Sequence, residues 1–589
     1  MHQGNDYNFP FFITILYKHV LMKKRIVSVA LCLSVFFSNA QQSYSAQQLD
    51  DMITFAAVDP LQKIFKETAF FENVEPVANV ARGEHASFQF AVRSTHTIRH
   101  LTASVVQVSR NVDLINKNSF VGFVGYTRVG RPLPNPSKDK LNPVSGFYPD
   151  PILDTPSVDL HNFTTQPIWV TVSIPENIAP GTHTGMLTIK GTIDGKNFSV
   201  DRRFSVKVYP VTIHETSLWV TNWFDIDKTK MKQLSGGKDS VMYSDRYWYW
   251  LKAAAKKMKE YDQNVIIASP IFLANISLNN NRYSFDFSRF DHFVQTFIDE
   301  GALKRIEGGH VGGRMGDWYS QFGLFVPYWK NDTMRFNCSP LSDSTVQSFY
   351  KQFIPALMSH LKEKGWDKMY LQHVCDEPES GNEKSYGEIA AYLKQLAPGI
   401  KTIDAVHSHG VNNTVDVWVP QLDFFNTDYD FYKERKAAGD EIWFYTCLAP
   451  QGDYANRFIE LPLIKTRILH WINFRFGATG YLHWGWNFWS QDPLNETSGI
   501  IPEAGNIMPG GDAFITYPGK GKILSSIRLE AMRDGIVDYE LLKMLETKKP
   551  EEAKEICRQV VYQFDKYDTD VKSFREKRKL ILELLTEGK

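Results

Sequence analysis

The stretch KMYLQHVCDEP, residues 368–378, joins an apolar, β-rich run to two adjacent acids and a proline. We expect a strand over Lys368–Val374. Pro378 prevents this strand from continuing, because proline has no N–H to donate to a sheet ladder. Adjacent acids are common at this composition, so the position of Asp376 and Glu377 at a strand end is the informative feature.

Strand-like runs alternate with helix-like segments on both sides of this stretch. We expect eight strands, at 218–224, 265–271, 305–310, 368–374, 401–406, 415–419, 442–447 and 481–488, with helices at 243–261, 288–298, 345–364 and 384–396 and further helical stretches after the sixth and seventh strands. About eight β/α units fit a (β/α)8 TIM barrel, whose active site lies at the carboxyl ends of the strands. An open, doubly wound sheet is the alternative, although no GxGxxG or GxxxxGKS motif supports it.

The rest of the chain divides into two further regions. Residues 41–213 read as short strands, and two β-rich runs around Asp194-Gly195 predict a hairpin. We therefore expect an N-terminal antiparallel β-sandwich over 41–213, a catalytic barrel over 214–530 and a C-terminal helical extension over 531–589. Charged residues of the extension, and Arg528, Glu530 and Arg533 just before it, are expected on a solvated helix surface with i,i+3 salt links.

The first forty residues have the layout of an upstream segment followed by a secretory signal peptide. Three basic residues, Lys23–Arg25, precede an apolar run over Ile26–Phe37, and the small residues Ser38 and Ala40 stand before a cut at Gln41. The apolar run is too short to span a membrane. We expect export across the inner membrane to the periplasm and no transmembrane segment in the mature chain.

Composition excludes some classes of partner. The chain has 66 basic and 66 acidic residues; residues 1–40 hold four and one of these, which leaves 62 and 65 and a net charge of −3. A polyanion-binding protein should be strongly basic, so we expect no nucleic-acid partner. The four cysteines that follow residue 40 are widely spaced and show no metal-ligand pattern, so we expect neither a metal nor a cofactor. The 14 Trp, 26 Tyr and 40 Phe residues suit either sugar rings or a large core.

Adjacent carboxyls suggest a particular glycosidase mechanism. Most glycosidases place two carboxyls on opposite sides of the scissile bond, and sequence neighbours are poorly placed for this. In substrate-assisted hydrolysis, a 2-acetamido oxygen of the substrate attacks instead. Glu377, with a pKa raised by apolar walls, would protonate the leaving oxygen, and ionised Asp376 would orient the acetamide N–H. The alternative is that the acids simply cap the next helix.

The segment His373–Pro378 resembles the catalytic segment of glycoside hydrolase family 123, the exo-acting β-N-acetylgalactosaminidases. The resemblance extends over most of the mature chain, including YLHWGWNFW at 481–489 and RLEAMRDGIVDYE at 528–540. It implies a β-sandwich before a (β/α)8 barrel, Asp376 as the acetamide-orienting residue, Glu377 as the acid/base, and a glycan with terminal β-linked N-acetylgalactosamine as substrate. The 528–540 segment is widespread among related barrel proteins and supports the fold more than the reaction.

Six other residues are candidate substrate-binding groups, each with a structural alternative. Trp484 and Trp486 are two apart and would share one strand face, either as a sugar cup or as barrel filling. Trp489 would stack on the leaving group. Tyr445 would bond the acetamide carbonyl oxygen or be a buried phenol. The remaining two are His373, near the acid/base or in the core, and Asn222, at the first strand end.

Other polar groups lie at predicted strand ends, and two alternative functions stay open. Asp225, Asp404 and His407 are possible ligands of sugar hydroxyls, and the glycine-rich loop 308–313 would place His310 or Arg314 near the pocket. A β-N-acetylglucosaminidase or other hexosaminidase of the same mechanism is one alternative. A non-catalytic glycan-binding protein is the alternative from another class.

Overall fold

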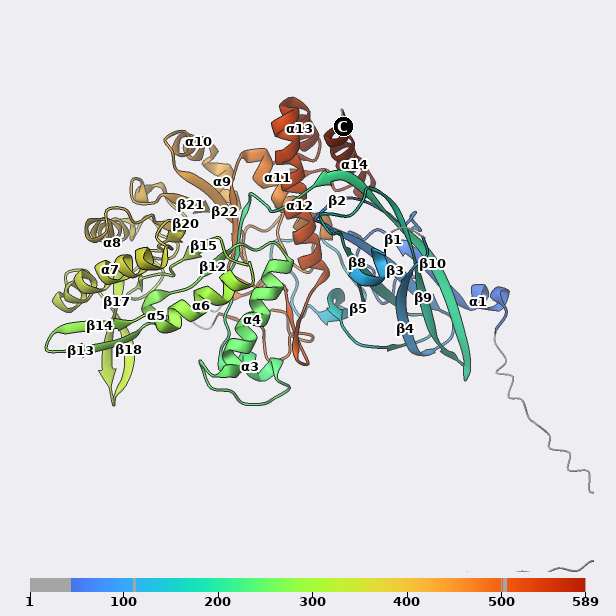
Figure 1. Ribbon diagram of the computed structural model, residues 1–589, viewed down its shortest axis with the longest axis horizontal. Coiled ribbons are helices and arrows are strands. Elements are labelled where there is room, and N and C mark those ends of the chain that lie inside the picture. The colour runs from blue at the N-terminus through green and yellow to red at the C-terminus, as the bar shows by residue number, and fades with distance from the viewer. Residues whose placement is uncertain (1–43, 110–112, 499, 502–505, 588–589) are drawn as a thin grey trace, which may run out of the picture. The chain divides into compact units, whose positions relative to one another are not determined.

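The structure is a computed structural model that describes residues 44–109, 113–498, 500–501 and 506–587 (Figure 1). The predicted upstream segment and signal peptide, residues 1–40, lie outside the described residues. None of the helices in the described part of the chain is both long and apolar enough to cross a membrane.

The N-terminal region consists of two five-stranded sheets. The first is antiparallel throughout, in the order β1 (Ile53–Val58), β3 (His85–Ser94), β8 (Thr165–Ser173), β5 (Ser119–Arg128) and β6 (Phe147–Leu153). The second has the order β2 (Val77–Arg82), β10 (Lys196–Thr212), β9 (Gly181–Ile193), β4 (Ile98–Gln107) and β7 (Val158–Leu160), with only β2 and β10 parallel. The short helices α1 (Ala46–Met52) and α2 (Ile115–Asn118) accompany these strands.

Alternating side chains give the two sheets a common core. Buried and partly exposed positions alternate along β9 and β10, as expected for strands with one face toward the interior. Apolar residues of both sheets meet in one cluster that includes Phe88, Phe90, Ile168, Leu187, Phe204 and Val206. The predicted hairpin is confirmed: β9 pairs antiparallel with β10, and Asp194 and Gly195 both take positive φ in the turn.

The middle of the chain forms a curled parallel sheet (Figure 1). Its eight strands are β11 (Trp219–Asn222), β12 (Val265–Ile267), β15 (Arg305–Glu307), β19 (Tyr370–Leu371), β20 (Ile403–Val406), β21 (Val417–Pro420), β22 (Glu441–Tyr445) and β23 (Gly480–His483). They pair in the orders β12-β15-β19 and β11-β23-β22-β21-β20. A parallel bridge from Gln372 to Thr402 joins the two sets at one side. At the other side the Asn264 N–H donates to the Val220 carbonyl at 3.2 Å.

All eight expected strands are present, but each is shorter than expected, and two of the differences affect the candidate site. The fourth is regular only over Tyr370–Leu371, and the last ends at His483 rather than near Phe488. The carboxyl ends of the strands still lie together, because the strands are parallel neighbours. This arrangement sets where the candidate site can form.

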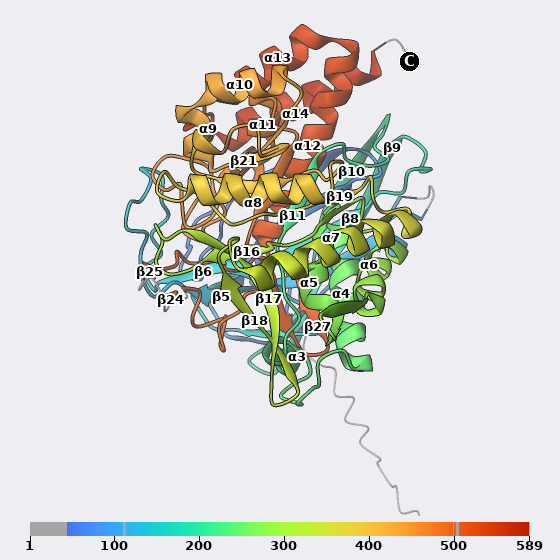
Figure 2. The same ribbon diagram turned by 90° about the vertical axis from the view of Figure 1, so that its left-hand side faces the viewer.

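Helices cover the outer side of the parallel strands, with α7 and α8 in front in Figure 2. The connecting helices are α3 (Lys228–Leu234), α4 (Asp245–Glu260), α5 (Pro270–Leu273), α6 (Ser288–Asp299), α7 (Ser344–Lys364), α8 (Glu383–Leu396), α9 (Leu422–Thr427), α10 (Tyr429–Ala437) and α11 (Leu463–Phe476), with a 3-10 turn, η1 (His409–Val411). Local signals set their ends: Asp343 caps α7 by accepting from the Thr345 N–H, and Gly365 ends it at φ 72°.

Two β-hairpin insertions extend the loops after the second and third parallel strands. The first contains β13 (Asn275–Asn279) and β14 (Arg282–Asp286); the second contains β16 (Gly312–Arg314), β17 (Phe322–Lys330) and β18 (Thr333–Ser339). Smaller pairs are β24 (Ile500–Ile501) with β25 (Asn506–Ile507), β26 (Tyr517–Gly519) with β27 (Lys522–Leu524), and β28 (Val561–Gln563) with β29 (Lys566–Tyr567). The β16–β17 loop, residues 315–321, belongs to the candidate site described below.

The expectation of a solvated C-terminal helix surface is wrong for the longest helix, α12 (Ile527–Lys548). Arg528, Glu530 and Arg533 are buried, because their partners come from distant parts of the chain. The predicted boundary at 530/531 falls inside this one continuous helix. Helices α13 (Pro550–Arg558) and α14 (Val571–Thr586) follow it.

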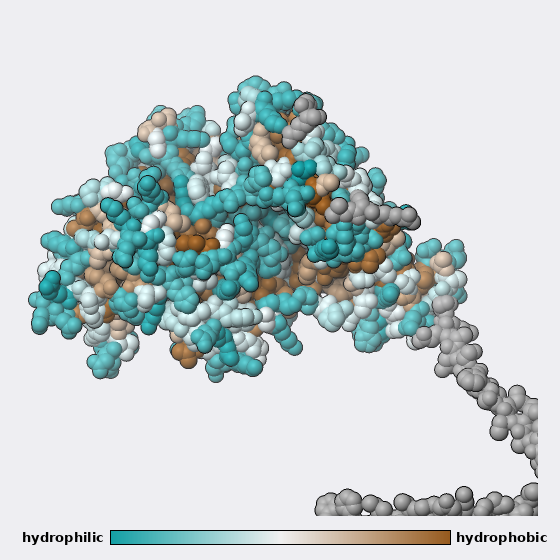
Figure 3. Space-filling view, in the orientation of Figure 1, coloured by the Kyte–Doolittle hydropathy of each residue, from teal (hydrophilic) through white to brown (hydrophobic). Residues whose placement is uncertain are grey.

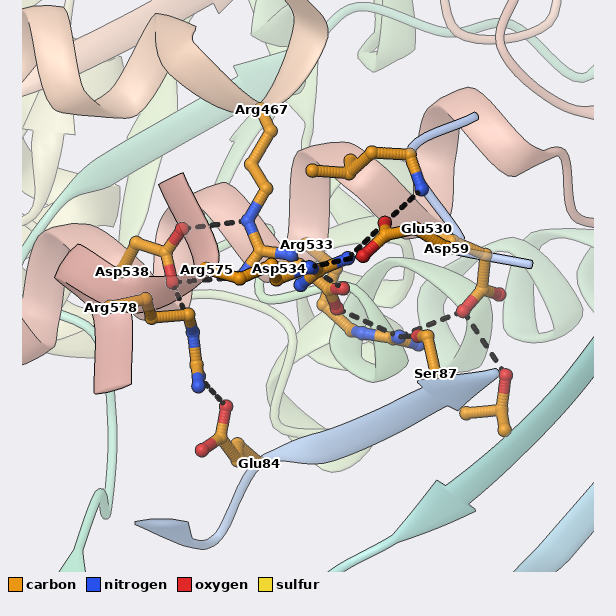
Figure 4. Close-up of polar contacts among 12 residues, drawn as sticks. Asp59, Glu84, Ser87, Arg467, Glu530, Arg533, Asp534, Asp538, Arg575 and Arg578 are labelled. Carbon is orange, nitrogen blue, oxygen red and sulfur yellow. Dashed lines mark hydrogen bonds and ion pairs between the residues drawn. The ribbon is translucent and has the colours of Figure 1, made fainter. Parts of the chain in front are cut away.

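A network of buried ion pairs joins α11, α12 and α14 to the N-terminal strands (Figure 4). Asp538 accepts from Arg467 and from Arg578, and Arg578 also pairs with Glu84 next to β3. Arg575 of α14 pairs with Asp59 at 2.8 Å. Buried charges are tolerated only when they are paired. In the pairs Arg578–Glu84 and Arg575–Asp59, one partner comes from the C-terminal helices and the other from the N-terminal region, so these pairs hold the two regions together.

The surface seen in Figure 3 is mainly hydrophilic, with apolar residues in separated patches. A cavity of about 930 Å³ lies between the N-terminal strands and the C-terminal helices, where Asp59, Glu84, Arg467, Arg575 and Arg578 line it. Each of these charged residues already has a partner: Asp59 pairs with Arg575, Glu84 with Arg578, and Arg467 with Asp538. Neither Asp376 nor Glu377 lines this cavity. It is therefore a gap at the packing interface rather than the candidate site.

Candidate active site

The chain turns sharply at Asp376 and Glu377, beyond the carboxyl end of β19. Glu377 takes a φ of 48°, a left-handed conformation that is uncommon outside glycine and that gathers at functional sites. Arg314 of β16 holds this turn, because its Nη2 donates to the Glu377 carbonyl oxygen at 2.7 Å. The turn brings the Asp376 side chain to 47% exposure and the Glu377 side chain to 17%. Both acids are therefore partly exposed to solvent.

The Glu377 carboxylate is held by groups from two other strand ends. Its Oε1 accepts a hydrogen bond from the Tyr445 hydroxyl at the end of β22, and His407 Nε2, just after β20, lies 3.3 Å away. Burial raises the pKa of Glu377, but the hydrogen bond and charge of His407, together with the Tyr445 hydrogen bond, outweigh it and hold this pKa below its ordinary value. The expectation of apolar walls and a raised pKa is wrong for the unliganded protein.

Asp376 has the opposite electrostatic tendency. Burial, followed by the charge of the adjacent Glu377, raises the pKa of Asp376 above its ordinary value. His310 opposes this rise, with its Nε2 3.7 Å from Asp376 Oδ1. In the unliganded protein the neighbouring acids are thus unequal, and Asp376 is the one that takes up a proton more readily. This order is the reverse of the order predicted from the sequence.

His407 links this pair to a third acid. Its Nδ1 lies 2.9 Å from Glu379 Oε1, and its Nε2 lies 2.6 Å from the Tyr445 hydroxyl. Burial lowers the pKa of His407, but hydrogen bonds and charges from Glu377 and Glu379 outweigh it and raise this pKa to about 8. The imidazole is therefore mostly protonated at neutral pH.

A buried charged cluster lies beneath Asp376. His373 lies between Asp404, 2.9 Å from its Nδ1, and Glu307, 3.4 Å from its Nε2. These carboxylates outweigh burial and raise the pKa of His373 to about 10. Trp223 donates its indole N–H to Glu307 at 2.6 Å, and its ring meets His310 and His373 edge-on. The cluster gives the acid pair a fixed, hydrogen-bonded support.

The same cluster has the spacing of metal ligands but not their protonation. His310, His373 and Asp404 offer ligand atoms within 4.8 Å of one another. Metal coordination requires a neutral imidazole nitrogen. With a pKa of about 10, His373 would have to give up a proton before a metal could bind to its nitrogen. We therefore interpret the cluster as an ion-paired support for the acid pair.

An exposed aromatic loop borders the acids. Trp318 is 42% exposed and Tyr319 67%, both on the β16–β17 loop. The Arg314 guanidinium packs on the Trp318 ring at 3.8 Å, and the Trp318 indole nitrogen lies 3.5 Å from Glu379 Oε1. Sequence reasoning missed Trp318, Glu379 and Trp223; only the glycine-rich stretch that begins this loop gave a signal. The sequence did indicate four other residues near the candidate site: Arg314, His310, Asp404 and His407.

The predicted tryptophans lie elsewhere than expected. Because β23 ends at His483, Trp484 and Trp486 are not alternate residues of one strand. Trp484 is half-buried and donates to Asp512 at 3.1 Å. Trp486 is fully buried and packs edge-on against Phe224. Trp489 is buried and donates to the Thr516 carbonyl at 2.7 Å, so the structure places its ring in the core rather than over a leaving group.

Three other predicted residues have buried partners. Tyr445 bonds Glu377, as described, rather than standing free for an acetamide. His373 is in the charged cluster. Asn222 is buried at the end of β11, where its Oδ1 accepts from Arg457. The structure thus brings together Asp376, Glu377 and Tyr445, with His373 below them. The substrate-binding roles of all the predicted residues stay predictions.

Comparisons with known proteins agree with this arrangement. The family description "Glycoside hydrolase 123, catalytic domain" matches residues 229–545, and "Glycoside hydrolase 123 N-terminal domain" matches residues 69–191. A family 123 glycoside hydrolase from Clostridium perfringens has a similar structure, with a TM-score of 0.67 at 17% identity over 91% of this chain and 97% of that one. No curated protein matches the chain.

More distant structures include a β-glucuronidase from Parabacteroides merdae, with 10% identity over 78% of this chain and 50% of that one. They also include a family 20 exo-β-N-acetylglucosaminidase from Vibrio harveyi, with 9% identity over 91% and 99%. Both have TM-scores of 0.26, which is too low to support an argument about fold.

The acid pair at the strand ends and the matched catalytic domain define the class of protein, a glycosidase. The catalytic-domain match covers more than half of the chain, and the N-terminal match adds most of the first region. The chain belongs to glycoside hydrolase family 123, which confirms the resemblance seen in the sequence.

Proposed function

We propose that the protein removes terminal β-linked N-acetylgalactosamine from glycans by a retaining mechanism in which the substrate's own 2-acetamido group is the nucleophile. The observation that carries this proposal is the pair Asp376–Glu377, adjacent in sequence and held at the strand ends by Arg314, Tyr445 and His407. The family membership supports glycoside hydrolysis, and the galacto preference rests on the resemblance described above.

The proposed architecture follows from the strand pairings. We propose that the eight parallel strands form a (β/α)8 barrel within residues 214–530 and that the two N-terminal sheets form a β-sandwich within 41–213, with the helices α12–α14 after the barrel. In such a barrel, catalytic side chains gather at the carboxyl ends of the strands. The site residues follow this rule, since they come from the ends of β19, β20 and β22.

Substrate binding would reverse the electrostatic order of the two acids. An acetamide N–H that donates to Asp376 favours the ionised form of this carboxyl. An ionised Asp376 in turn raises the pKa of its neighbour, because a second negative charge becomes costly. Glu377 then holds the proton that the leaving oxygen needs, and Asp376 stabilises the positive charge of the oxazolinium. After the leaving group departs, Glu377 accepts a proton from the water that attacks the anomeric carbon and opens the oxazolinium ring.

The nature of the glycan is a further part of the proposal. The Clostridium perfringens relative was described for its hydrolysis of glycolipid glycans. We propose that the substrate is a glycan of this general kind. We also propose that residues 22–40 direct export of the protein to the periplasm and are then removed. Mass spectrometry of the periplasmic protein should show Gln41 as its first residue; an intact N-terminus would contradict export by this signal.

The test of function compares two aryl glycosides. Protein beginning at Gln41 is incubated with 4-nitrophenyl β-N-acetylgalactosaminide and with the corresponding β-N-acetylglucosaminide. We expect nitrophenol release with a clear preference for the galacto sugar. A preference for the gluco sugar would overturn the specificity but keep the mechanism. If neither sugar nor a natural oligosaccharide is cleaved, the catalytic proposal fails.

Trp318 gives a separate prediction about the leaving-group sugar. One ring face is covered by Arg314, yet the residue stays 42% exposed beside the acids. Aromatic faces stack on the apolar faces of sugars, and removing such a ring exposes both surfaces to water. Replacing Trp318 by Ala should lower kcat/KM for an oligosaccharide about 10-fold, at a cost of about 1.4 kcal/mol, and leave hydrolysis of a β-N-acetylgalactosaminyl azide nearly unchanged.

The matched control for this prediction is Tyr319→Ala, which removes the neighbouring exposed ring. Tyr319 donates its backbone N–H to Asp317, and none of its described hydrogen bonds is to Asp376 or Glu377, so we expect little change with either substrate. Equal losses on the oligosaccharide and on the azide after Trp318→Ala would contradict a leaving-group role for this ring.

A further inference from the structure

Four side chains form a continuous hydrogen-bonded row that ends at Glu377. Glu379 Oε1 lies 2.9 Å from His407 Nδ1, and His407 Nε2 lies 2.6 Å from the Tyr445 hydroxyl. The Tyr445 hydroxyl then donates to Glu377 Oε1. The row draws on the loop after β19, the loop after β20 and the end of β22, so it exists only in the folded protein.

The donors and acceptors of the row balance only when His407 carries two protons. An imidazolium donates from both nitrogens, here to Glu379 and to the Tyr445 oxygen, and Tyr445 donates its one proton to Glu377. A neutral His407 protonated at Nδ1 would present a lone pair to Tyr445. The Tyr445 hydroxyl has one proton and could then donate it either to His407 or to the Glu377 carboxylate, which leaves the other acceptor without this hydrogen bond. The contacts therefore describe a row polarised toward Glu377.

We propose that His407 stores the proton that Glu377 delivers to the leaving group, and that the Tyr445 hydroxyl carries it between them. This inference rests on the proposed function. The His407 Nε2 proton moves to the Tyr445 oxygen while the Tyr445 hydroxyl proton moves to Glu377 Oε1. Glu377 then gives a proton to the glycosidic oxygen as the bond to the anomeric carbon breaks. Water attack returns a proton to Glu377, and the same steps in reverse restore the imidazolium.

The surroundings of His407 favour this storage. The titratable groups that face its ring are Glu377, Glu379 and Tyr445, and the uncharged rings of Phe424 and Trp318 pack nearby. The two carboxylates raise the pKa of His407 to about 8, whereas Glu377 keeps a pKa below its ordinary value. At neutral pH the proton thus resides on the histidine, whose Nε2 is closer to the Tyr445 hydroxyl, at 2.6 Å, than to Glu377 Oε1, at 3.3 Å.

The pH dependence has a definite sign. The stored proton is present below about pH 8 and is lost as the pH rises through this value. The wild-type kcat/KM should therefore decline on the basic side near pH 8. In His407→Gln, Glu377 must rely on its own proton, and the basic limb should move to lower pH by at least about one unit.

The experiment measures pH profiles with two leaving groups. With a poor leaving group such as a methyl or sugar alcohol, His407→Gln should lower kcat at pH 7 by about 10²-fold. With a 2,4-dinitrophenolate leaving group, which departs without a proton, the loss should be a few-fold at most. Tyr445→Phe should give the same pattern, because the carrier is missing. If Tyr445 instead aligned the acetamide, both substrates would lose rate equally.

The control is His409→Gln, two residues along. His409 is also paired with an acid, Asp428 at 2.9 Å, but it is partly exposed and has no contact with Glu377 among its described hydrogen bonds and ion pairs. It should leave both pH profiles unchanged. Circular dichroism establishes that each variant is folded. A basic limb that stays near pH 8 in His407→Gln, with equal losses on both leaving groups, would overturn the relay. Wild-type protein that fails on both substrates would instead contradict the proposed function.

Discussion

Replacing Glu377 by Gln is expected to lower kcat/KM for a substrate with a poor leaving group by about 10²- to 10⁴-fold, the usual contribution of general acid catalysis. The amide keeps the size of the side chain, and its oxygen can still accept from the Tyr445 hydroxyl. It has no acidic proton for the glycosidic oxygen. The fold should be retained, since the turn is held through the Glu377 backbone by Arg314.

The leaving group separates loss of the acid from loss of structure. A 2,4-dinitrophenyl glycoside needs little protonation, so Glu377→Gln should affect it far less than a methylumbelliferyl or oligosaccharide substrate. Glu388→Gln, at an exposed position of α8, is the matched control and should leave both rates unchanged. A Glu377→Gln enzyme that keeps wild-type rates on poor leaving groups would refute the acid assignment.

Replacing Arg528 by Met is expected to destabilise the protein by about 3–5 kcal/mol, the cost of removing one partner of a buried ion pair. The fully buried guanidinium donates twice to Asp150, at 2.9 and 2.8 Å, and also to the carbonyls of Arg457, Gly511 and Phe514. Methionine fills much of the volume but leaves the Asp150 charge unpaired. Urea unfolding followed by tryptophan fluorescence measures the change.

The comparison variant is Arg558→Met, which removes the exposed pair of Arg558 with Glu555 on α13. Surface pairs contribute about 1 kcal/mol or less, so its unfolding midpoint should stay close to that of the wild type. Equal shifts for the two variants would show that the buried network does not stabilise the junction between the sheets and the helices.

Much of the fold was predictable from the sequence because it depends on local patterns. Alternating strand-like and helix-like runs gave the eight parallel strands in their order, and Asp194-Gly195 gave the β9–β10 hairpin. Strand ends were less predictable. Buried strand and buried loop have the same apolar composition, so Trp486 looked like a strand residue although β23 ends at His483.

The charged core could not be predicted because its partners are far apart in the sequence. From local sequence, Arg528 and Arg578 are both expected on the surface of a helix. In the structure, Arg528 pairs with Asp150 and Arg578 pairs with Glu84. Local sequence shows only the i,i+3 pair of Glu530 and Arg533, which exists but is buried. Whether a charged residue is buried depends on how separate regions pack together. The periodicity of apolar residues along the sequence does not predict this burial.

The acid pair was predictable, but its electrostatics were not. Pro378 and the strand before it mark Asp376 and Glu377 at a strand end. The pKa of Glu377, however, is set by His407 and Tyr445, which come from two other strand ends. The exposed Trp318 lies on a hairpin insertion that is held beside the acids by contacts between residues distant in sequence, among them those of Arg314 with the Glu377 carbonyl and of Asn382 with the Trp318 carbonyl.

The measurement that tests the central claim most directly is the rate of hydrolysis of 4-nitrophenyl β-N-acetylgalactosaminides whose acetyl group carries none, one, two or three fluorine atoms. Fluorine withdraws electron density from the carbonyl oxygen that would attack the anomeric carbon. If the substrate's acetamide is the nucleophile, kcat/KM should fall steeply with each added fluorine. Rates that stay constant across the series would contradict acetamide participation, and with it the roles proposed for Asp376 and Glu377.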